Sequence, residues 1–175
     1  PGRELILNGY WLSQILFYGI YRAFDLIGIV FLRAALLLVP PVAILVFGWR
    51  RAPWSPVVVL LSLLCGWAML AVSGIRPNHL TVACVPLLFI LLESVGYAAE
   101  RQGAGYSLRK AWLLPPFMLV WANLHGGFLA GIAIITLFVL SESVTQAYQK
   151  GPLKPVLHLW GIALVSVLAT LLRPV

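Results

Sequence analysis

The sequence predicts an all-α protein, a polytopic transmembrane bundle of about six helices preceded by an amphipathic helix. Of the 175 residues, 62% are hydrophobic and 10% are charged, whereas soluble domains carry about 25% charged residues. Apolar runs of membrane-spanning length recur along the chain, and short basic loops separate them. We therefore interpret residues 1–175 as a single transmembrane domain and expect membrane lipids as its surroundings. Because the chain begins at Pro1, we also expect it to be an internal fragment of a longer protein.

The N-terminal helix is expected over residues 8–24. Large apolar and aromatic side chains recur at helical spacing from Trp11 to Tyr18, while the polar residues Gln14 and Arg22 fall among them. An aromatic-rich helix interrupted by polar groups is typical of a segment that lies in the membrane interface rather than crossing it.

Six apolar spans are expected after this helix, at residues 26–48, 55–73, 79–97, 110–123, 126–145 and 156–172. Two proline pairs, Pro40–Pro41 and Pro115–Pro116, remove helical hydrogen bonds and are expected to kink the spans that contain them. Cys65 and Cys84 both fall within spans and lack the spacing of a metal site or a disulfide framework. We therefore expect both to be small buried apolar side chains.

The basic residues sort into alternate loops. The segments 49–51, 100–110 and 150–154 hold seven of the twelve Lys and Arg residues, including all three lysines. Short loops of this composition mark the cytoplasmic side of a membrane protein. The N-terminal helix, Arg76 and the turn at His125 are then expected on the extracytoplasmic side. The net charge of +7 does not predict nucleic-acid binding, because no basic helix or stripe is present to follow a phosphate backbone.

The most informative segment is the polar turn that contains Asn123 and His125. It interrupts an apolar run, residues 111–140, that is too long for one crossing of about 20 residues and too short for two crossings with a loop. The turn should therefore lie below the membrane surface, where irregular backbone must be buried in protein or face a water-filled cavity. We favour a cavity in which His125 donates a hydrogen bond or shuttles a proton. The alternative is a tight helix connection, and we assign Gly127 and Gly131 to close helix packing.

Three further residues are candidates for an outward-facing site that binds an anionic group such as a lipid-carrier phosphate. Arg76 and His79 are expected on the same side as His125, and arginine binds phosphate through two parallel hydrogen bonds. Arg76 can equally well cap a helix and reach the head groups, and His79 can be a simple interfacial histidine. Arg33 lies inside a span, which makes it a functional hypothesis, although it can also reach outward or pair with Asp25.

Catalytic and cofactor motifs are absent from the sequence. It contains no catalytic-triad order, glycine-rich phosphate loop or Cys/His cluster, so no metal site and no cofactor are expected and the catalytic residues stay unknown. Glu4 and Asp25 are the acids expected outside, and no general base is evident. At the cytoplasmic ends of the spans we expect almost no polar groups, and we interpret Glu93 and His158 as interfacial.

Four segments carry a resemblance to a known family: Trp11–Arg22, Gly28–Leu37, Arg76–Asn78 and, most distinctively, Trp121–Gly131. In these segments the chain resembles bacterial polytopic proteins of the GT-C glycosyltransferase superfamily, akin to the dolichyl-phosphate-mannose protein mannosyltransferases. The likeness covers most of the chain. It departs at Asn78, where the family usually carries Gln, and at residues 173–175, where the family usually reads Asn-Pro-Tyr-Gly.

The resemblance implies transfer of a sugar from a polyprenyl-phosphate-linked donor to an acceptor, outside the bacterial cytoplasmic membrane. The donor phosphate and the acceptor would be bound by Arg33, Arg76, His79, Asn123 and His125. The catalytic carboxylate of this superfamily follows its first span, so it is expected upstream of Pro1, and a divalent metal in the full-length protein is left open.

Two alternative functions come from other classes. A transporter or flippase for an anionic lipid or solute also uses spans broken by polar turns, but the expected scarcity of polar groups at the cytoplasmic ends disfavours it. A non-catalytic membrane scaffold is the other alternative.

Overall fold

The computed structural model describes residues 10–53, 55–71, 77–102 and 107–172, with residues 97–102 described by their backbone alone. These residues form helices and no strand, which confirms the all-α bundle. The helices are α1 (Trp11–Arg51), α2 (Pro56–Leu70), α3 (Asn78–Gln102), α4 (Leu108–Ala111), α5 (Leu114–Leu124), α6 (Phe128–Tyr148) and α7 (Lys154–Ala169).

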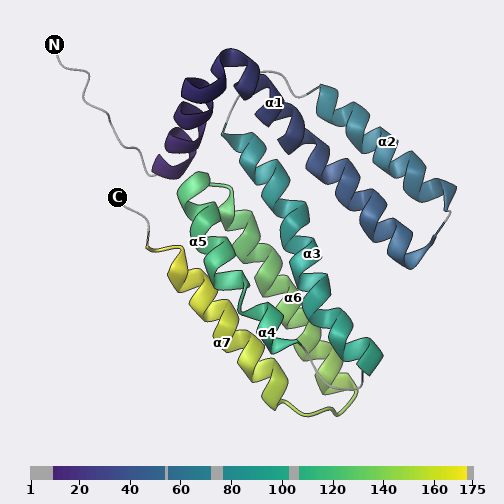
Figure 1. The fold of residues 1–175 in the computed structure, drawn as a ribbon. Coiled ribbons are helices and arrows are strands. Elements are labelled where there is room, and N and C mark those ends of the chain that lie inside the picture. The colour runs from purple at the N-terminus through teal and green to yellow at the C-terminus, as the bar shows by residue number, and fades with distance from the viewer. Residues whose placement is uncertain (1–9, 54, 72–76, 103–106, 173–175) are drawn as a thin grey trace.

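The helices form two groups on either side of α3 (Figure 1). On one side, α2 packs on the long second part of α1; on the other, α5, α6 and α7 pack together. The buried apolar core lies between α3 and this second group, and its fully enclosed members include Leu88, Val95, Met118, Trp121 and Ile135. The α1–α2 pair is therefore attached to the outside of a four-helix core.

The helix α1 consists of two helical segments that meet at Asp25. The backbone there has φ 55° and ψ −156°, a left-handed conformation that residues other than glycine rarely adopt. The Asp25 carboxylate accepts a hydrogen bond from the Leu26 N–H (2.8 Å), one of the N–H groups at the start of the second segment that have no partner within the helix. In Figure 1 the chain turns back on itself at this point. From the sequence we expected the N-terminal helix at residues 8–24 and the first span at residues 26–48. The break at Asp25 falls between these two ranges.

The two proline pairs occupy different positions in their helices. In α1 the backbone leaves helical geometry at Asp25 and not at Pro40–Pro41. Pro115 and Pro116 stand in the first turn of α5, just after the break that separates it from α4. The N–H groups of a first helical turn have no partner within the helix, so proline is tolerated there.

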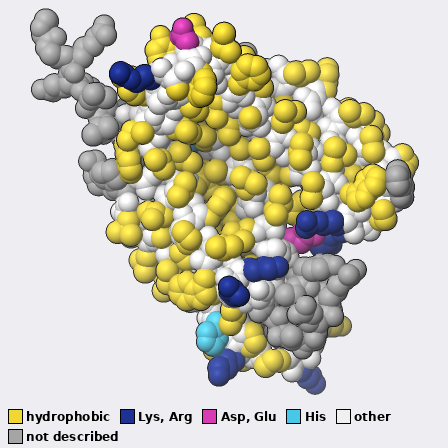
Figure 2. Space-filling model, viewed as in Figure 1, with side chains coloured by type: hydrophobic (Ala, Val, Ile, Leu, Met, Phe, Trp, Pro, Cys, Tyr) yellow, Lys and Arg dark blue, Asp and Glu magenta, His cyan; other side chains and the backbone are white. Residues whose placement is uncertain are grey.

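Within the described residues, three helices are long and apolar enough to cross a membrane: α1, α3 over Asn78–Gly96, and α6. The expected spans 55–73, 110–123 and 156–172 form shorter helices of 15, 11 and 16 residues. Large apolar side chains are exposed over the surface (Figure 2), as in Phe31 and Trp67, which are 71% and 75% exposed. Apolar exposure on this scale suits lipid rather than water, and the chain is an integral membrane protein.

The two ends of the bundle differ in charge. We call one end the basic end; there α1 meets α2, α3 meets α4, and α6 meets α7, and Figure 2 shows Lys and Arg side chains gathered at this lower end of the view. We call the other the histidine end, formed by Tyr10–Trp11, the start of α3 and the α5–α6 turn. Their separation agrees with the alternation of loops in the sequence, and the assignment of the basic end to the cytoplasm stays a prediction.

Candidate functional site around His125

The α5–α6 turn reverses the chain in three residues, from His125 to Gly127. The backbone of His125 is extended (φ −163°, ψ 149°), and its N–H donates to the Trp121 carbonyl oxygen (3.0 Å), which ends α5. Asn123 is 5% exposed, while His125 is half-buried. The reversal therefore places one polar side chain inside the bundle and one at its edge.

Two hydrogen bonds reach Nδ1 of His125, and a third supports one of them. The Trp121 Nε1–H donates to Thr81 Oγ1 (3.3 Å), and Thr81 Oγ1 lies 2.9 Å from His125 Nδ1. The Gly127 backbone N–H also donates to Nδ1 (3.1 Å). A backbone N–H can only donate, so Nδ1 must accept, and the neutral ring carries its proton on Nε2. The turn lies outside the spanning helices, and burial lowers the pKa of His125, which favours the same neutral form.

Asn123 joins the N-terminal helix to α5. Its Oδ1 accepts a hydrogen bond from Trp11 Nε1 (2.7 Å), and its Nδ2 donates to the Leu119 carbonyl oxygen (2.9 Å). Beside it, the Tyr10 ring stacks on the His125 imidazole, with centroids 5.6 Å apart and planes 29° apart. Both polar ends of the buried amide are therefore satisfied within the protein, as a buried polar group requires.

Gly127 and Gly131 allow the close packing that the sequence predicted. A Cβ atom at Gly127 would overlap the Thr81 side chain, and one at Gly131 would lie 2.5 Å from Trp121 Cζ3 and 3.0 Å from Met118 Sδ. The small residues let α6 approach both α3 and α5. This approach brings the Gly127 N–H and Thr81 to the same nitrogen of His125.

The other predicted site residues occupy different places. His79 is 2% exposed in the first turn of α3. Because it is two residues before Thr81, it projects from nearly the opposite side of that helix, about 200° away. Arg33 is half-buried on α1, eight residues or about 12 Å beyond the break at Asp25. Arg76 lies outside the described residues, as does Arg173.

The sequence did not reveal Trp11, Thr81 or Trp121 as parts of this network. Thr81 and Trp121 are 40 residues apart, and Trp11 and Asn123 are 112 apart. The available signal was weak: a hydroxyl or an indole N–H within apolar sequence needs a partner when it is buried. That signal marks a donor without identifying its acceptor.

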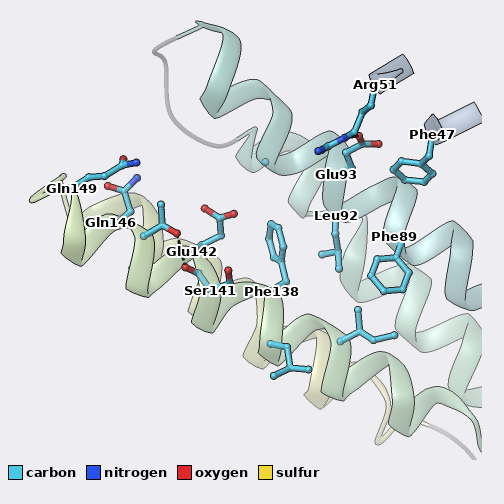
Figure 3. Close-up of a pocket in the computed structure, with 14 residues that line it drawn as sticks. Phe47, Arg51, Phe89, Leu92, Glu93, Phe138, Ser141, Glu142, Gln146 and Gln149 are labelled. Atoms are coloured by element: carbon cyan, nitrogen blue, oxygen red, sulfur yellow. Dashed lines mark hydrogen bonds and ion pairs between the residues drawn. The ribbon is translucent and has the colours of Figure 1, made fainter. Parts of the chain in front are cut away.

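A second polar feature lies at the basic end, between α1, α3 and α6 (Figure 3). It is a groove of about 820 Å³ whose lining includes Arg51, Glu93, Phe138 and Glu142. Arg51 Nε and Glu93 Oε1 are 3.1 Å apart, and the Glu93 side chain is 16% exposed. The expectation of almost no polar groups at these ends of the spans was therefore wrong. The two carboxylates are 49 residues apart in the sequence, and helix packing alone brings them to one groove.

No metal site is found within the described residues: no three His, Cys, Asp or Glu side chains there are close enough to hold an ion. Comparison with known proteins found no matching family model, no similar characterised protein and no similar solved structure. The function must therefore be argued from the geometry of the chain itself.

Replacing Thr81 tests the hydrogen-bond network. Thr81→Val keeps the shape but leaves Trp121 Nε1 and His125 Nδ1 without the hydroxyl, so we expect a loss of about 1–3 kcal/mol of stability. Thr81→Ser keeps the hydroxyl and should cost less than about 1.5 kcal/mol. Thermal unfolding of the purified chain in a mild detergent measures both. Equal unfolding temperatures for the two variants would show that the hydroxyl contributes nothing.

A matched pair of glycines tests the packing of α6. Gly131→Ala places a methyl group against the Trp121 ring and should destabilise the chain by about 1–3 kcal/mol. Gly161→Ala in α7 is the control, because a Cβ there meets nothing within 4 Å, and alanine should stabilise that helix by about 0.5–1 kcal/mol. The same unfolding measurement applies. A Gly131→Ala protein as stable as the Gly161→Ala protein would contradict the close contact.

Proposed function

We propose that this chain is part of a membrane glycosyltransferase that transfers a sugar from a polyprenyl-phosphate-linked donor. The observation that supports the proposal is the fixed state of His125. Both hydrogen bonds to Nδ1 come from the protein, so Nε2–H is the ring donor available to a ligand. A positioned N–H of this kind stabilises a phosphate oxygen or a reacting hydroxyl oxygen. This turn lies within Trp121–Gly131, the segment in which the resemblance to the GT-C superfamily is most distinctive.

The rest of the histidine end suits the same role. Tyr10 stacks on the imidazole and limits its movement, and the Trp11–Asn123 hydrogen bond holds the N-terminal helix beside the turn. In the proposal this end faces the extracytoplasmic side, Arg33 and Arg76 contribute positive charge toward the donor phosphate, and His79 and Asn123 help to form the binding site. No residue of this chain is assigned as the catalytic carboxylate.

Two substitutions of His125 test the roles of its two ring nitrogens separately. His125→Asn keeps an acceptor near the position of Nδ1, where Thr81 and Gly127 donate, but removes the Nε2–H donor. In the full-length protein we expect near-normal thermal stability and a loss of sugar transfer of about 10²-fold or more. His125→Gln carries a donor near the position of Nε2 and should retain more transfer than His125→Asn. Sugar transfer from a polyprenyl-phosphate-linked donor to an acceptor is the measurement.

Unchanged transfer in the His125→Asn protein would remove the role that we give to Nε2.

A second function, transport of a lipid or an anionic solute, is favoured by the groove at the basic end, because a transporter presents polar groups toward both sides of the membrane. Movement of a labelled lipid between the leaflets of vesicles that contain the full-length protein, with no sugar transfer, would replace the glycosyltransferase proposal with this one.

A further inference from the structure

A separate groove lies between α4 and α7, and we call it the α4–α7 groove. It has a volume of about 430 Å³, within the range of about 300–1,000 Å³ that is usual for ligand pockets. One wall is formed by Leu108 and Trp112, and the other by the face of α7 that runs from Lys154 to Val165. A Cβ on Gly161, in the α7 wall, would meet nothing within 4 Å. The groove therefore has room for a ligand beside α7.

The α7 wall changes from polar to apolar along the helix. Lys154 and His158 are one helical turn apart at its start, and Gly161, Ile162 and Val165 follow on the same face, because residues three or four apart are neighbours on a helix surface. His158 Nδ1 lies 2.8 Å from the Lys154 carbonyl oxygen. A carbonyl oxygen can only accept, so the ring N–H donates and holds the imidazole at the polar end. The groove thus has a polar end and an apolar end, as a lipid molecule has.

The polar end of the α4–α7 groove is positively charged. Lys154 lines it, and Arg109 and Lys110 of α4 are exposed next to the other wall. The sequence contains no Asp or Glu at residues 101–141 or 143–175, so neither wall carries a carboxylate. Lys154 is therefore not neutralised from α4 or α7, and the charge of the groove favours an anionic ligand.

The length of the groove fits one leaflet of a bilayer. Lys154 and Val165 are eleven residues apart, or about 16 Å along the helix axis, and half of the hydrocarbon core of a bilayer is about 15 Å. Trp112, two residues after Lys110, is 56% exposed, and exposed tryptophans are typical of the level of the lipid head groups. A single acyl chain that enters at that level can therefore follow α7 over the whole apolar part of the groove.

We propose that the α4–α7 groove binds an anionic glycerophospholipid such as phosphatidylglycerol. The Lys154 ammonium donates hydrogen bonds to the lipid phosphate, Arg109 and Lys110 add positive charge around it, and one acyl chain lies along α7 against Gly161 and Val165. Hydrogen bonds between an ammonium group and a phosphate are of the strong, charge-assisted kind. The site shares no residue with the network at His125 and does not depend on the function proposed above.

Binding of two lipids with the same acyl chains tests the inference. We expect the purified protein in a mild detergent to bind phosphatidylglycerol about tenfold more tightly than phosphatidylcholine, whose head group carries no net charge. Native mass spectrometry during lipid titration gives both affinities. Equal affinity for the two lipids would overturn the proposal.

Two charge substitutions locate the preference for the anionic lipid. Lys154→Gln removes the ammonium group that lines the groove and should reduce the preference to about threefold or less. Arg50→Gln is the matched control, because it removes one positive charge from an exposed position in the last turn of α1. It should leave the preference at about tenfold. The same preference in both variants, reduced or not, would show that Lys154 has no special part in binding and would contradict the assignment.

Two glycine substitutions test the apolar part of the groove. Gly161→Leu fills the space beside α7 without changing the charge and should weaken phosphatidylglycerol binding about tenfold. Gly19→Leu in the N-terminal segment of α1 is the matched control, because a Cβ there also meets nothing within 4 Å, and it should leave binding unchanged.

Unchanged phosphatidylglycerol binding by the Gly161→Leu protein would overturn the proposal. So would a dimer that forms without lipid and is lost in that variant, because it would assign the groove to a second copy of the chain. The comparison of the two lipids on the unaltered protein stands even if a variant does not fold.

Discussion

The structure depends on satisfying a few polar groups inside an apolar bundle. Where lipid replaces water, an unpaired N–H or hydroxyl costs several kcal/mol, about the worth of several ordinary contacts. The indole of Trp121, the hydroxyl of Thr81 and the N–H of Gly127 are all satisfied around Nδ1 of His125. Because these groups belong to α5, α3 and the start of α6, satisfying them sets how the three helices meet.

At the histidine end, the same side chain belongs both to the hydrophobic core and to the candidate site. The Trp121 ring is fully buried in the core, contacts the edge of Phe117 and lies against Gly131. The same side chain donates the hydrogen bond that begins the network at His125. A change that shifts this ring therefore moves a donor as well as a packing surface, so the geometry around His125 is only as rigid as the α5–α6 contact.

Local signals in the sequence predicted much of the fold and part of the site. Hydropathy marked the helices, and the polar residues near Asp25 marked the division of α1, because both are properties of neighbouring residues. The turn at His125 was also recognised locally. Sequence could not identify Trp11 as a partner of Asn123 or Thr81 as a partner of His125, because these residues come from helices that are distant in the chain and meet the turn only through packing. Hydropathy also placed the C-terminal ends of α2 and α7 three residues too far along the chain, because these ends depend on where the backbone turns rather than on where apolar residues stop.

The polar side chains at the two ends of the bundle differ in charge. The side chains that the network joins at the histidine end are neutral: indole, hydroxyl, amide and an imidazole protonated on Nε2. Neutral dipoles can be enclosed at modest cost because no ion has to leave water. In the groove at the basic end the groups are ionised, and they stay within about three helical turns of the helix ends, where head groups and water still reach them. The groove at the basic end therefore presents charged side chains of both signs, whereas the network at the histidine end presents oriented neutral dipoles.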